Sequence, residues 1–305
     1  MQKYILNRLL QGIVLLFIVA LIVFALARAT GNPADLMVPE DATEEERQFV
    51  ERNLGLDRPY HVQLFVFLTG IVRGDFGDSI VYKKPAAELF FERLPNTLKL
   101  LPLSMFIAIS VAIPLGVVAA VKRGTWIDQV AGAIAVFGVA TPNFWIAIVC
   151  IYIFSVWLDV LPPGRMGGPL HYILPAFTLG TFSIAGIMRL IRSSMLEVLD
   201  TEYVKLARIK GLQEWKVFWK HCLRNALIPV LTLFGVFVGG FVTGAIVTET
   251  VFAWPGIGRL TIDAVAQRDF PLLQAVILLD AVIILAVNLM VDILYAYINP
   301  RIRYD

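Results

Sequence analysis

Residues 202–229 read EYVKLARIKGLQEWKVFWKHCLRNALIP, a polar and strongly basic segment between long apolar runs. Apolar side chains recur every three or four residues on both sides of Gly211, which gives each half one apolar helical face. Because glycine adopts positive φ without steric cost, Gly211 suits a turn between the halves. The segment predicts two amphipathic helices, with apolar faces formed by Met195, Leu199, Tyr203 and Leu206 before the turn and by Trp215, Phe218, Cys222 and Ala226 after it.

Lys216, Lys220 and Arg224 repeat every four residues in the second half. Like charges at this spacing weaken an isolated helix, so we expect an anionic group outside the helix to compensate them. Two interpretations fit: helices that lie on the membrane with their cations toward lipid headgroups, or a docking element for a cytoplasmic protein. The charge pattern leaves both open.

The composition is that of a polytopic membrane protein. The chain has 305 residues, of which 58% are hydrophobic and only 16% charged, and it contains repeated uncharged runs near twenty residues. Cys150 lies in an apolar run and Cys222 in the basic segment, so we expect no disulfide. The three histidines are scattered, and no Cys/His spacing predicts a metal site.

Six apolar runs are long enough to cross a hydrocarbon layer of about 30 Å. The first follows Lys3 and Arg8 and is too long for a cleavable signal sequence, so we expect it to remain as a span. The third is overlong and interrupted at Thr141-Pro142, which predicts a kinked or tilted helix. The predicted spans are residues 9–27, 100–121, 130–158, 172–188 and 227–248, and a sixth between 272 and 298.

A polar insert, residues 31–96, follows the first span. Thr43-Glu44-Glu45-Glu46 predicts a capping box that opens a short helix, which Gly55 can close. Asp57-Arg58-Pro59 predicts the start of a second helix that runs to about Arg73-Gly74. A third helix is expected over 85–93, ended by Pro95. The insert is either a small folded cap or a contact surface for an external partner, and the sequence does not separate these.

Basic residues set the orientation of the chain. The loop between the fourth and fifth spans, residues 192–226 and hereafter the basic loop, shares one side with both termini. That side is predicted to be cytoplasmic. It carries Lys3, Arg8, Lys122, Arg123, the cations of the basic loop, Arg301 and Arg303, whereas the two short loops opposite hold only Arg165, Arg259 and Arg268.

No catalytic motif is present. The chain has no phosphate-binding G-x-x-x-x-G-K-[ST] loop, so we expect no ATP hydrolysis by it, and it has neither H-E-x-x-H nor a nucleophile elbow. Asp280 and Asp292 lie in the sixth span, where charges are costly; each has either a structural pairing role or a role in a solute or ion pathway. Glu249, at the outer end of the fifth span, is similarly ambiguous.

Glycines mark the fifth span and the turn after it. Small residues four apart let helices approach closely, within one subunit or against a second one. The next stretch, residues 249–259, reads ETVFAWPGIGR and predicts a tight turn with interfacial aromatic residues. The glycines of the span are Gly235, Gly239, Gly240 and Gly244.

The chain resembles the inner-membrane permease subunits of ATP-binding-cassette (ABC) importers, and most of all their dipeptide, oligopeptide and nickel group. Lys205-Leu206 and Arg224 depart from the broader "EAA" loop consensus of these permeases in the manner of the peptide branch. The matching segments follow one another along nearly the whole chain: residues 31–34 (GNPA), 54–59 (LGLDRP), 92–97 (ERLPNT), 113–116 (IPLG), 142–145 (PNFW), 173–176 (ILPA), 192–195 (RSSM), 202–229, 249–256 and 299–301 (NPR).

The resemblance implies an all-α fold of six transmembrane helices, the type I ABC importer permease fold, with a small extracytoplasmic helical insert. Its parts are residues 1–30 with the first span, the insert 31–96, and a core 97–305 that carries the basic loop as its cytoplasmic coupling loop. Implied coupling residues are Glu202, Tyr203, Ala207, Lys210, Gly211 and Trp215; an extracytoplasmic gate or loop comprises Glu249, Trp254, Pro255 and Gly256; and pathway or structural polar residues are Asn143, Asp280 and Asp292.

The resemblance also implies partners. These are a similar but distinct second permease subunit, two cytoplasmic ATPase subunits that bind ATP and Mg²⁺, and an external solute-binding protein, in a bacterial or archaeal cytoplasmic membrane. No cofactor on this chain and no nucleic acid is expected. Di- or oligopeptides are the default solute, with nickel chelates, glutathione and oligosaccharides as alternatives. A transporter or channel that works without ATPases, and a purely structural anchor, are the competing classes.

Overall fold

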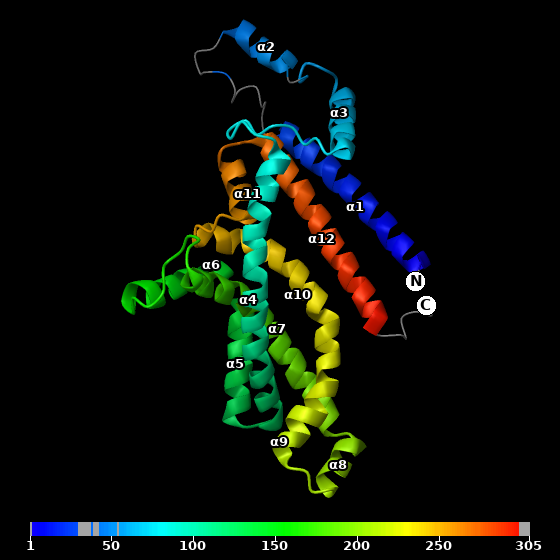
Figure 1. The fold of residues 1–305 in the computed structure, drawn as a ribbon, viewed down its shortest axis with the longest axis vertical. Coiled ribbons are helices and arrows are strands. Elements are labelled where there is room, and N and C mark those ends of the chain that lie inside the picture. Colours follow the sequence, from blue (N-terminus) through cyan, green and yellow to red (C-terminus); the bar gives the residue numbers. More distant parts are fainter. Residues whose placement is uncertain (1, 30–37, 39–42, 54, 299–305) are drawn as a thin grey trace. The chain divides into compact units, whose positions relative to one another are not determined.

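A computed structural model of the chain describes residues 2–29, 38, 43–53 and 55–298. These residues form helices joined by turns and loops (Figure 1), with one isolated β-bridge, between Asp78 and Pro85. The elements are α1 (Gln2–Ala29), α2 (Glu44–Asn53), α3 (Tyr60–Arg73), α4 (Ala86–Val121), α5 (Trp126–Ala140), α6 (Asn143–Cys150), the π-helix η2 (Ile151–Trp157), the 3₁₀ turn η3 (Pro169–Tyr172), α7 (Ile173–Leu199), α8 (Glu202–Ile209), α9 (Glu214–Lys216), the π-helix η4 (Val217–Cys222), α10 (Leu223–Val251), α11 (Ile257–Ala266) and α12 (Phe270–Ile298).

The predicted all-α membrane protein is confirmed. Among the described residues, four helical segments are long and apolar enough to cross a membrane: Ile5–Ala29, Ala86–Val121, Pro169–Leu199 and Phe270–Val291. The pair Trp126–Ala140 and Asn143–Trp157, bent by 107°, is a fifth if it counts as one span. The predicted fifth run lies within the 29-residue α10, and the total of six spans stays a prediction.

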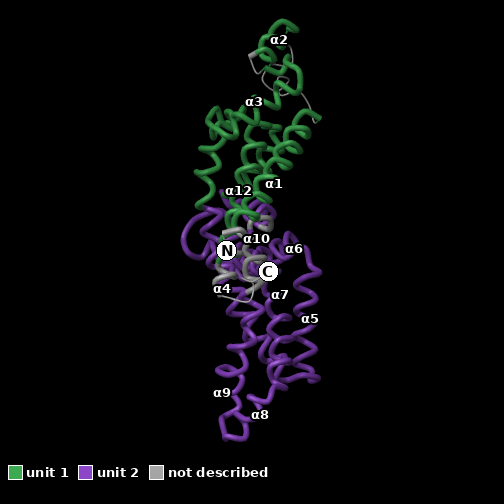
Figure 2. The backbone as a smooth tube through the Cα atoms, turned by 90° about the vertical axis from the view of Figure 1, so that its right-hand side faces the viewer, with its two compact units in different colours: residues 1–95, 256–305 green, residues 96–255 purple. Residues whose placement is uncertain are grey.

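The chain folds as two compact units, coloured separately in Figure 2. Unit 1 comprises residues 1–95 and 256–305, and unit 2 comprises residues 96–255. The helix α4 contributes residues to both.

Two of the three helices predicted in the insert, α2 and α3, are present in unit 1. Thr43 and Glu46 form the capping box, with Glu46 N–H donating to Thr43 Oγ1 at 3.3 Å and Thr43 N–H donating to Glu46 Oε2 at 2.8 Å. Gly55 follows α2 with φ of +65°, and Gly74 ends α3 with φ of +76°. The segment 31–34 and Leu54 lie outside the described residues.

Pro95 does not end a helix, and the prediction of a separate third helix over 85–93 is wrong. The 36-residue helix α4 runs straight through this position, over about 54 Å at 1.5 Å per residue. Leu89 and Phe90 before Pro95, and Thr97 and Leu100 after it, are all buried. Because burial on both sides holds the backbone helical, the one hydrogen bond that proline cannot donate does not break the helix.

The buried carboxylate of Asp269 makes several hydrogen bonds at the start of α12 in unit 1. Asp269 caps α12 by accepting from Leu272 N–H at 3.3 Å. It also accepts from the hydroxyl of Ser79 and from the N–H groups of Ile80 and Val81, both at 3.2 Å. Asp269 therefore fastens the loop that precedes α4 to the start of α12.

In unit 2 the helices α4 and α7 cross at a glycine. A Cβ atom on Gly116 would lie 2.8 Å from the Ile191 Cβ and from the Met188 carbonyl oxygen. No real side chain fits at such a distance, so glycine is required for this approach. This requirement gives a physical reason for glycine in the segment 113–116.

The interruption at Thr141-Pro142 is confirmed and is sharper than a kink. Thr141 is extended, with φ of −87° and ψ of +127°, as expected before proline. The axes of α5 and of α6 with η2 differ by 107°, and α6 visibly leaves the direction of α5 in Figure 1. Asn143 is the first residue of α6 and is half-buried.

Candidate functional site

The turn of the basic loop has the geometry predicted for it. Helix α8 ends at Ile209, and Gly211 takes a left-handed conformation with φ of +73°. Gly211 N–H donates to the Arg208 oxygen at 2.9 Å and Leu212 N–H to the Ala207 oxygen at 3.3 Å. This pair of bonds is a Schellman motif, which satisfies the last carbonyls of the helix.

Two side-chain links hold the halves of the loop together. The guanidinium of Arg208 donates to both carboxylate oxygens of Glu214 across the turn, at 3.0 and 3.4 Å. Asn225 Nδ2 donates to the Tyr203 hydroxyl at 2.7 Å, which joins α10 to α8. The loop is therefore a folded hairpin of helices with defined side-chain contacts.

The inner face of this hairpin is part of the main core of unit 2. Val204 and Ala207 of α8 and Val217 and Cys222 of η4 are buried in the same cluster as Met195 of α7. The cluster continues without interruption into α4, α5 and α10. Burial also raises the pKa of the Cys222 thiol. The hairpin and the helices packed on it therefore share one core.

The outer face differs from the predicted apolar face. Tyr203, Leu206 and Trp215, expected to share faces with buried residues, are exposed. For Tyr203 and Leu206 the reason is that α7 ends at Leu199 and the chain turns before α8 starts, so the helical phase that begins at Met195 is interrupted. After Trp215 the chain continues as the π-helix η4, whose period differs from that of an α-helix.

An apolar surface results at the end of the hairpin. Ile209 is 82% exposed and Trp215 59% exposed. In a loop predicted to lie outside the membrane, such a patch is typical of an interaction surface. The apolar tip, as this surface is called below, consists of Leu206, Ile209, Leu212, Trp215 and Trp219.

Charged groups of the loop are exposed as well. Lys216, Lys220 and Arg224 are all exposed, and the anionic group expected to compensate them stays a prediction. Glu202 and Lys205 form an exposed ion pair at 2.8 Å, which contributes little to stability. Lys210 caps the C-terminus of α8 beside Gly211.

A cavity of about 220 Å³ lies beneath the hairpin, where α4 and α7 end. Its walls are both polar and apolar and include two arginines and one carboxylate. The lining residues are Ala120, Val121, Arg123, Leu196, Leu199, Asp200, Arg208 and Phe218.

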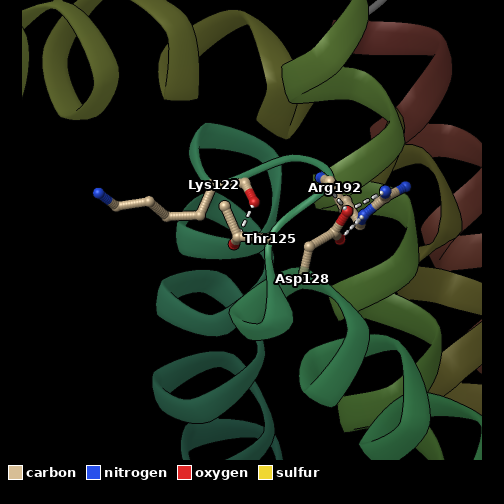
Figure 3. Close-up of polar contacts among 5 residues, drawn as sticks. Lys122, Thr125, Asp128 and Arg192 are labelled. Atoms are coloured by element: carbon tan, nitrogen blue, oxygen red, sulfur yellow. Dashed lines mark hydrogen bonds and ion pairs between the residues drawn. The ribbon is translucent and has the colours of Figure 1, made fainter.

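Beside this cavity, an ion pair joins the start of α5 to α7 (Figure 3). Arg192 Nε donates to Asp128 Oδ1 at 2.6 Å, and Arg192 Nη2 donates to Asp128 Oδ2 at 2.8 Å. Asp128 Oδ2 also accepts from Gly124 N–H at 3.0 Å. The sequence reading did not single out Asp128, since its partner is 64 residues away along the chain.

The residues expected in an extracytoplasmic gate or loop lie near the end of α10 and the start of α11, where Glu249, Trp254 and Gly256 are buried and Pro255 is half-buried. The Trp254 side chain is fully buried, donates from Nε1 to the Asn96 oxygen at 2.9 Å and meets Tyr172 edge to face at 4.8 Å. Glu249 is also fully buried and accepts from the Thr97 hydroxyl at 2.6 Å. Asn96 Nδ2 donates to the Pro255 oxygen at 3.0 Å, and Gly256 caps α11.

Trp254 was expected to lie in the membrane interface, but it is packed inside the protein. The tight turn itself is present, with Ala253 at a φ of +51°. Trp254 lies inside the protein because its indole N–H donates to a backbone oxygen of α4. This arrangement ties the C-terminal end of α10 to α4.

The polar residues of the sixth span are described in part. Asp280 is half-buried, and its Oδ1 has no hydrogen-bond partner among the described residues. The pairing role considered for Asp280 stays a prediction. The side chain of Asp292, the surroundings of the α10 glycines and the segment 299–301 lie outside the described residues.

Two family models match this chain. The N-terminal model of binding-protein-dependent transport system membrane components covers residues 1–101, and the model "Binding-protein-dependent transport system inner membrane component" covers residues 112–304. The chain belongs to this family of inner-membrane permeases. It is therefore the membrane component of a binding-protein-dependent ABC transporter and not the ATPase subunit.

Curated relatives are similar over their whole length. The chain is 40% identical over 317 residues to the "Oligopeptide transport system permease protein AppB" of Bacillus subtilis, with all of both chains covered. It is 43% identical over 305 residues to the "Glutathione transport system permease protein GsiC" of Salmonella choleraesuis, again with full coverage of both.

A solved structure shares the fold. A chain of the MetNI methionine ABC transporter, in an inward-facing conformation, matches with a TM-score of 0.59. The match covers 69% of this chain and 96% of that chain, at 16% sequence identity. At this identity the likeness shows the fold alone.

Proposed function

We propose that this permease takes up peptides, with di- and oligopeptides as the principal solutes. The observation that carries the proposal is full-length identity of 40% and 43% to permeases named for oligopeptides and for glutathione. Both names describe peptide-like molecules with an amide backbone and charged ends. Glutathione is the competing solute, because the relative named for it is as similar as the other.

Competitive uptake tests the solute. Proteoliposomes that contain the permease pair, its ATPases and its binding protein should accumulate a labelled dipeptide or short oligopeptide only when ATP is inside. Unlabelled oligopeptide should compete, whereas a nickel chelate or an oligosaccharide should not. Competition by glutathione alone would move the assignment to that solute. Uptake driven by an ion gradient without ATPases would contradict the importer mechanism itself.

The basic loop is the proposed docking element for a cytoplasmic ATPase. Support comes from its folded hairpin, its exposed apolar tip and the shared core that joins it to the membrane helices. The inner face of the hairpin belongs to the core of unit 2 and its apolar tip is exposed, and we assign this tip to a groove on the separate ATPase subunit of this class of transporter.

Transport follows from movement of two such loops. Closure of the two ATPases around ATP and Mg²⁺ brings the basic loops of two permease subunits together. The helices packed on each loop then switch from an inward-facing to an outward-facing arrangement. The second permease subunit is a similar but distinct chain, and the ATP and Mg²⁺ are held by the ATPases.

The remaining parts are assigned by topology. With six spans, both termini and the basic loop lie in the cytoplasm, and the insert 31–96 lies outside, where the external binding protein delivers solute. Glu249, Trp254, Pro255 and Gly256 hold the extracytoplasmic end, and their buried contacts support a structural rather than a mobile role. Asn143, Asp280 and Asp292 are pathway candidates.

Thiol labelling tests this topology. Cys150 and Cys222 are both free and buried, and burial raises the pKa of the Cys222 thiol, so both should react slowly. A maleimide that cannot cross the membrane should label Lys210→Cys only from the cytoplasmic side. It should label Phe49→Cys, on the exposed face of α2, only from outside. The reverse pattern would overturn the orientation.

A further inference from the structure

The contact between Asp128 and Arg192 fixes the start of α5 against α7. Both oxygens of the carboxylate meet the guanidinium, at 2.6 and 2.8 Å. A bidentate ion pair sets the relative orientation of the two helices that bear its side chains, as well as the distance between them. The Asp128 side chain is only 11% exposed and that of Arg192 34%, so solvent weakens this pair less than an exposed one.

The same carboxylate also shapes the turn that precedes α5. Asp128 Oδ2 accepts from Gly124 N–H, and the Thr125 hydroxyl donates to the Lys122 oxygen at 2.6 Å. Gly124 itself has a positive φ of 78°. Through Asp128, Arg192 is therefore linked both to the first turn of α5 and to the tight turn that follows α4 (Figure 3).

The two helices lead to different parts of unit 2. Beyond Arg192, α7 carries Met195, which shares a core with Val204 and Val217 of the basic loop. Beyond Asp128, α5 runs to the 107° bend and on to α6. Arg192 is the first residue of the basic loop, so the ion pair lies between the hairpin of α8, α9 and η4 and the bent span.

A second contact joins the same helices farther along α5. A Cβ atom on Gly138 would lie 3.3 Å from the Ala185 Cβ, so the helix backbones are close there as well. That contact is apolar, as is the packing of Ala131 and Ala135 of α5 in the shared core, whereas the ion pair is bidentate and fixes an orientation. The ion pair therefore adds a directional contact to the packing of α5 against α7.

We propose that Asp128 and Arg192 are positioning residues that make α5 and the bent α5–α6 span follow α7 when the basic loop moves. This inference rests on the proposed function, because it needs an ATPase to move the loop. Without the link, ATP hydrolysis continues but less of each movement reaches the bent span. The result is a lower yield of transported solute for each ATP consumed.

The test uses the complete transporter, with both permease subunits, ATPases and binding protein, in proteoliposomes. The quantities measured are oligopeptide taken up per ATP hydrolysed and the amount of assembled complex. The variants are Asp128→Asn, whose amide oxygen can still accept from Gly124, Arg192→Lys, which keeps the charge but loses the fork, and the double variant. Lys122→Gln is the matched control, because this cation lies on the same turn but points away from the pair (Figure 3).

Each single variant should lower the uptake per ATP by at least about fivefold, the lower end of typical coupling between sites. The double variant should be no worse than the single ones, because they break the same link. Lys122→Gln should match the native transporter. A purely structural pair would instead reduce the amount of complex and leave the uptake per ATP unchanged.

Several results would overturn the proposal: an unchanged ratio in Asp128→Asn, an equal fall in Lys122→Gln, or additive losses in the double variant. If the transporter with Asp128→Asn does not assemble, the uptake per ATP of the transporter with Arg192→Lys is the deciding measurement. Failure of both to assemble would also count against it, because the pair would then be a folding requirement. Absence of ATP-driven uptake by the native complex would overturn the proposed function instead.

Discussion

At the scale of single residues, Gly211 has a conformational rather than a steric role. Its φ of +73° is the left-handed region that favours glycine. No described atom lies within 4 Å of the position that its Cβ would take. A larger side chain therefore meets no obstacle but must adopt a backbone geometry that costs about 1–2 kcal/mol.

This distinction gives a prediction for Gly211. Gly211→Val should distort the turn and reduce association with the ATPases, because a β-branched residue tolerates the left-handed region poorly. Gly211→Asn, of comparable size, should retain most association, because asparagine tolerates this region. The measurement is the amount of ATPase that co-purifies with each permease. Equal recovery with valine and asparagine would show that the turn geometry is not what the partner requires.

Residues whose partners are near in sequence could be predicted, and those with distant partners could not. The turn at Gly211 and the capping box at Thr43 depend on neighbours within five residues, so the local sequence pattern was enough to predict them. Asp269 and Ser79 are 190 residues apart, and Asp128 and Arg192 are 64 apart. A single sequence carries no signal for such pairs.

At the scale of elements, the crossing of α4 and α7 depends on glycine. Gly116 has the Met188 oxygen and the Ile191 side chain 2.8 Å from where its Cβ would be. Backbone atoms on the other helix cannot rotate away, so an added side chain forces the two helices apart. Gly132 of α5 provides the contrast, with no described atom within 4 Å of its Cβ position.

Leucine substitutions at these two glycines should therefore have different effects. Gly116→Leu should destabilise the permease by about 1–3 kcal/mol, the usual cost of overpacking. Gly132→Leu should cost little, since the exchange also raises helix propensity. The thermal unfolding midpoint of each purified complex measures this. Equal midpoints for the two variants would be inconsistent with the close helix contact.

The element boundaries that the sequence missed have different causes. Tertiary packing keeps α4 helical at Pro95, whereas the apolar spacing from Met195 to Leu206 does not show that the helix ends between them. The flanks of Pro95 are buried, and the chain turns between Leu199 and Glu202. By contrast, the break at Thr141-Pro142 was predictable because the backbone before proline is restricted wherever it occurs.

At the scale of the whole molecule, hydropathy and motif order predicted the class of protein. Family models matched to residues 1–101 and 112–304 confirm the resemblance that ran along the chain. The position of the basic loop in the sequence was predictable, but its apolar tip was not, because exposure depends on how α8 packs against η4. Solute specificity is not encoded in any pattern recognised in this chain.

The central claim is that the basic loop carries movement from an ATPase to the membrane helices. Its most direct test places a photoreactive amino acid at Ile209 of the assembled transporter in its membrane, with Val72 of the exposed α3 surface as the control position. Illumination should join the Ile209 probe to the ATPase, in a yield that changes when ATP is added, and should join the Val72 probe to no ATPase. Adducts of the Ile209 probe with lipid alone would contradict the account.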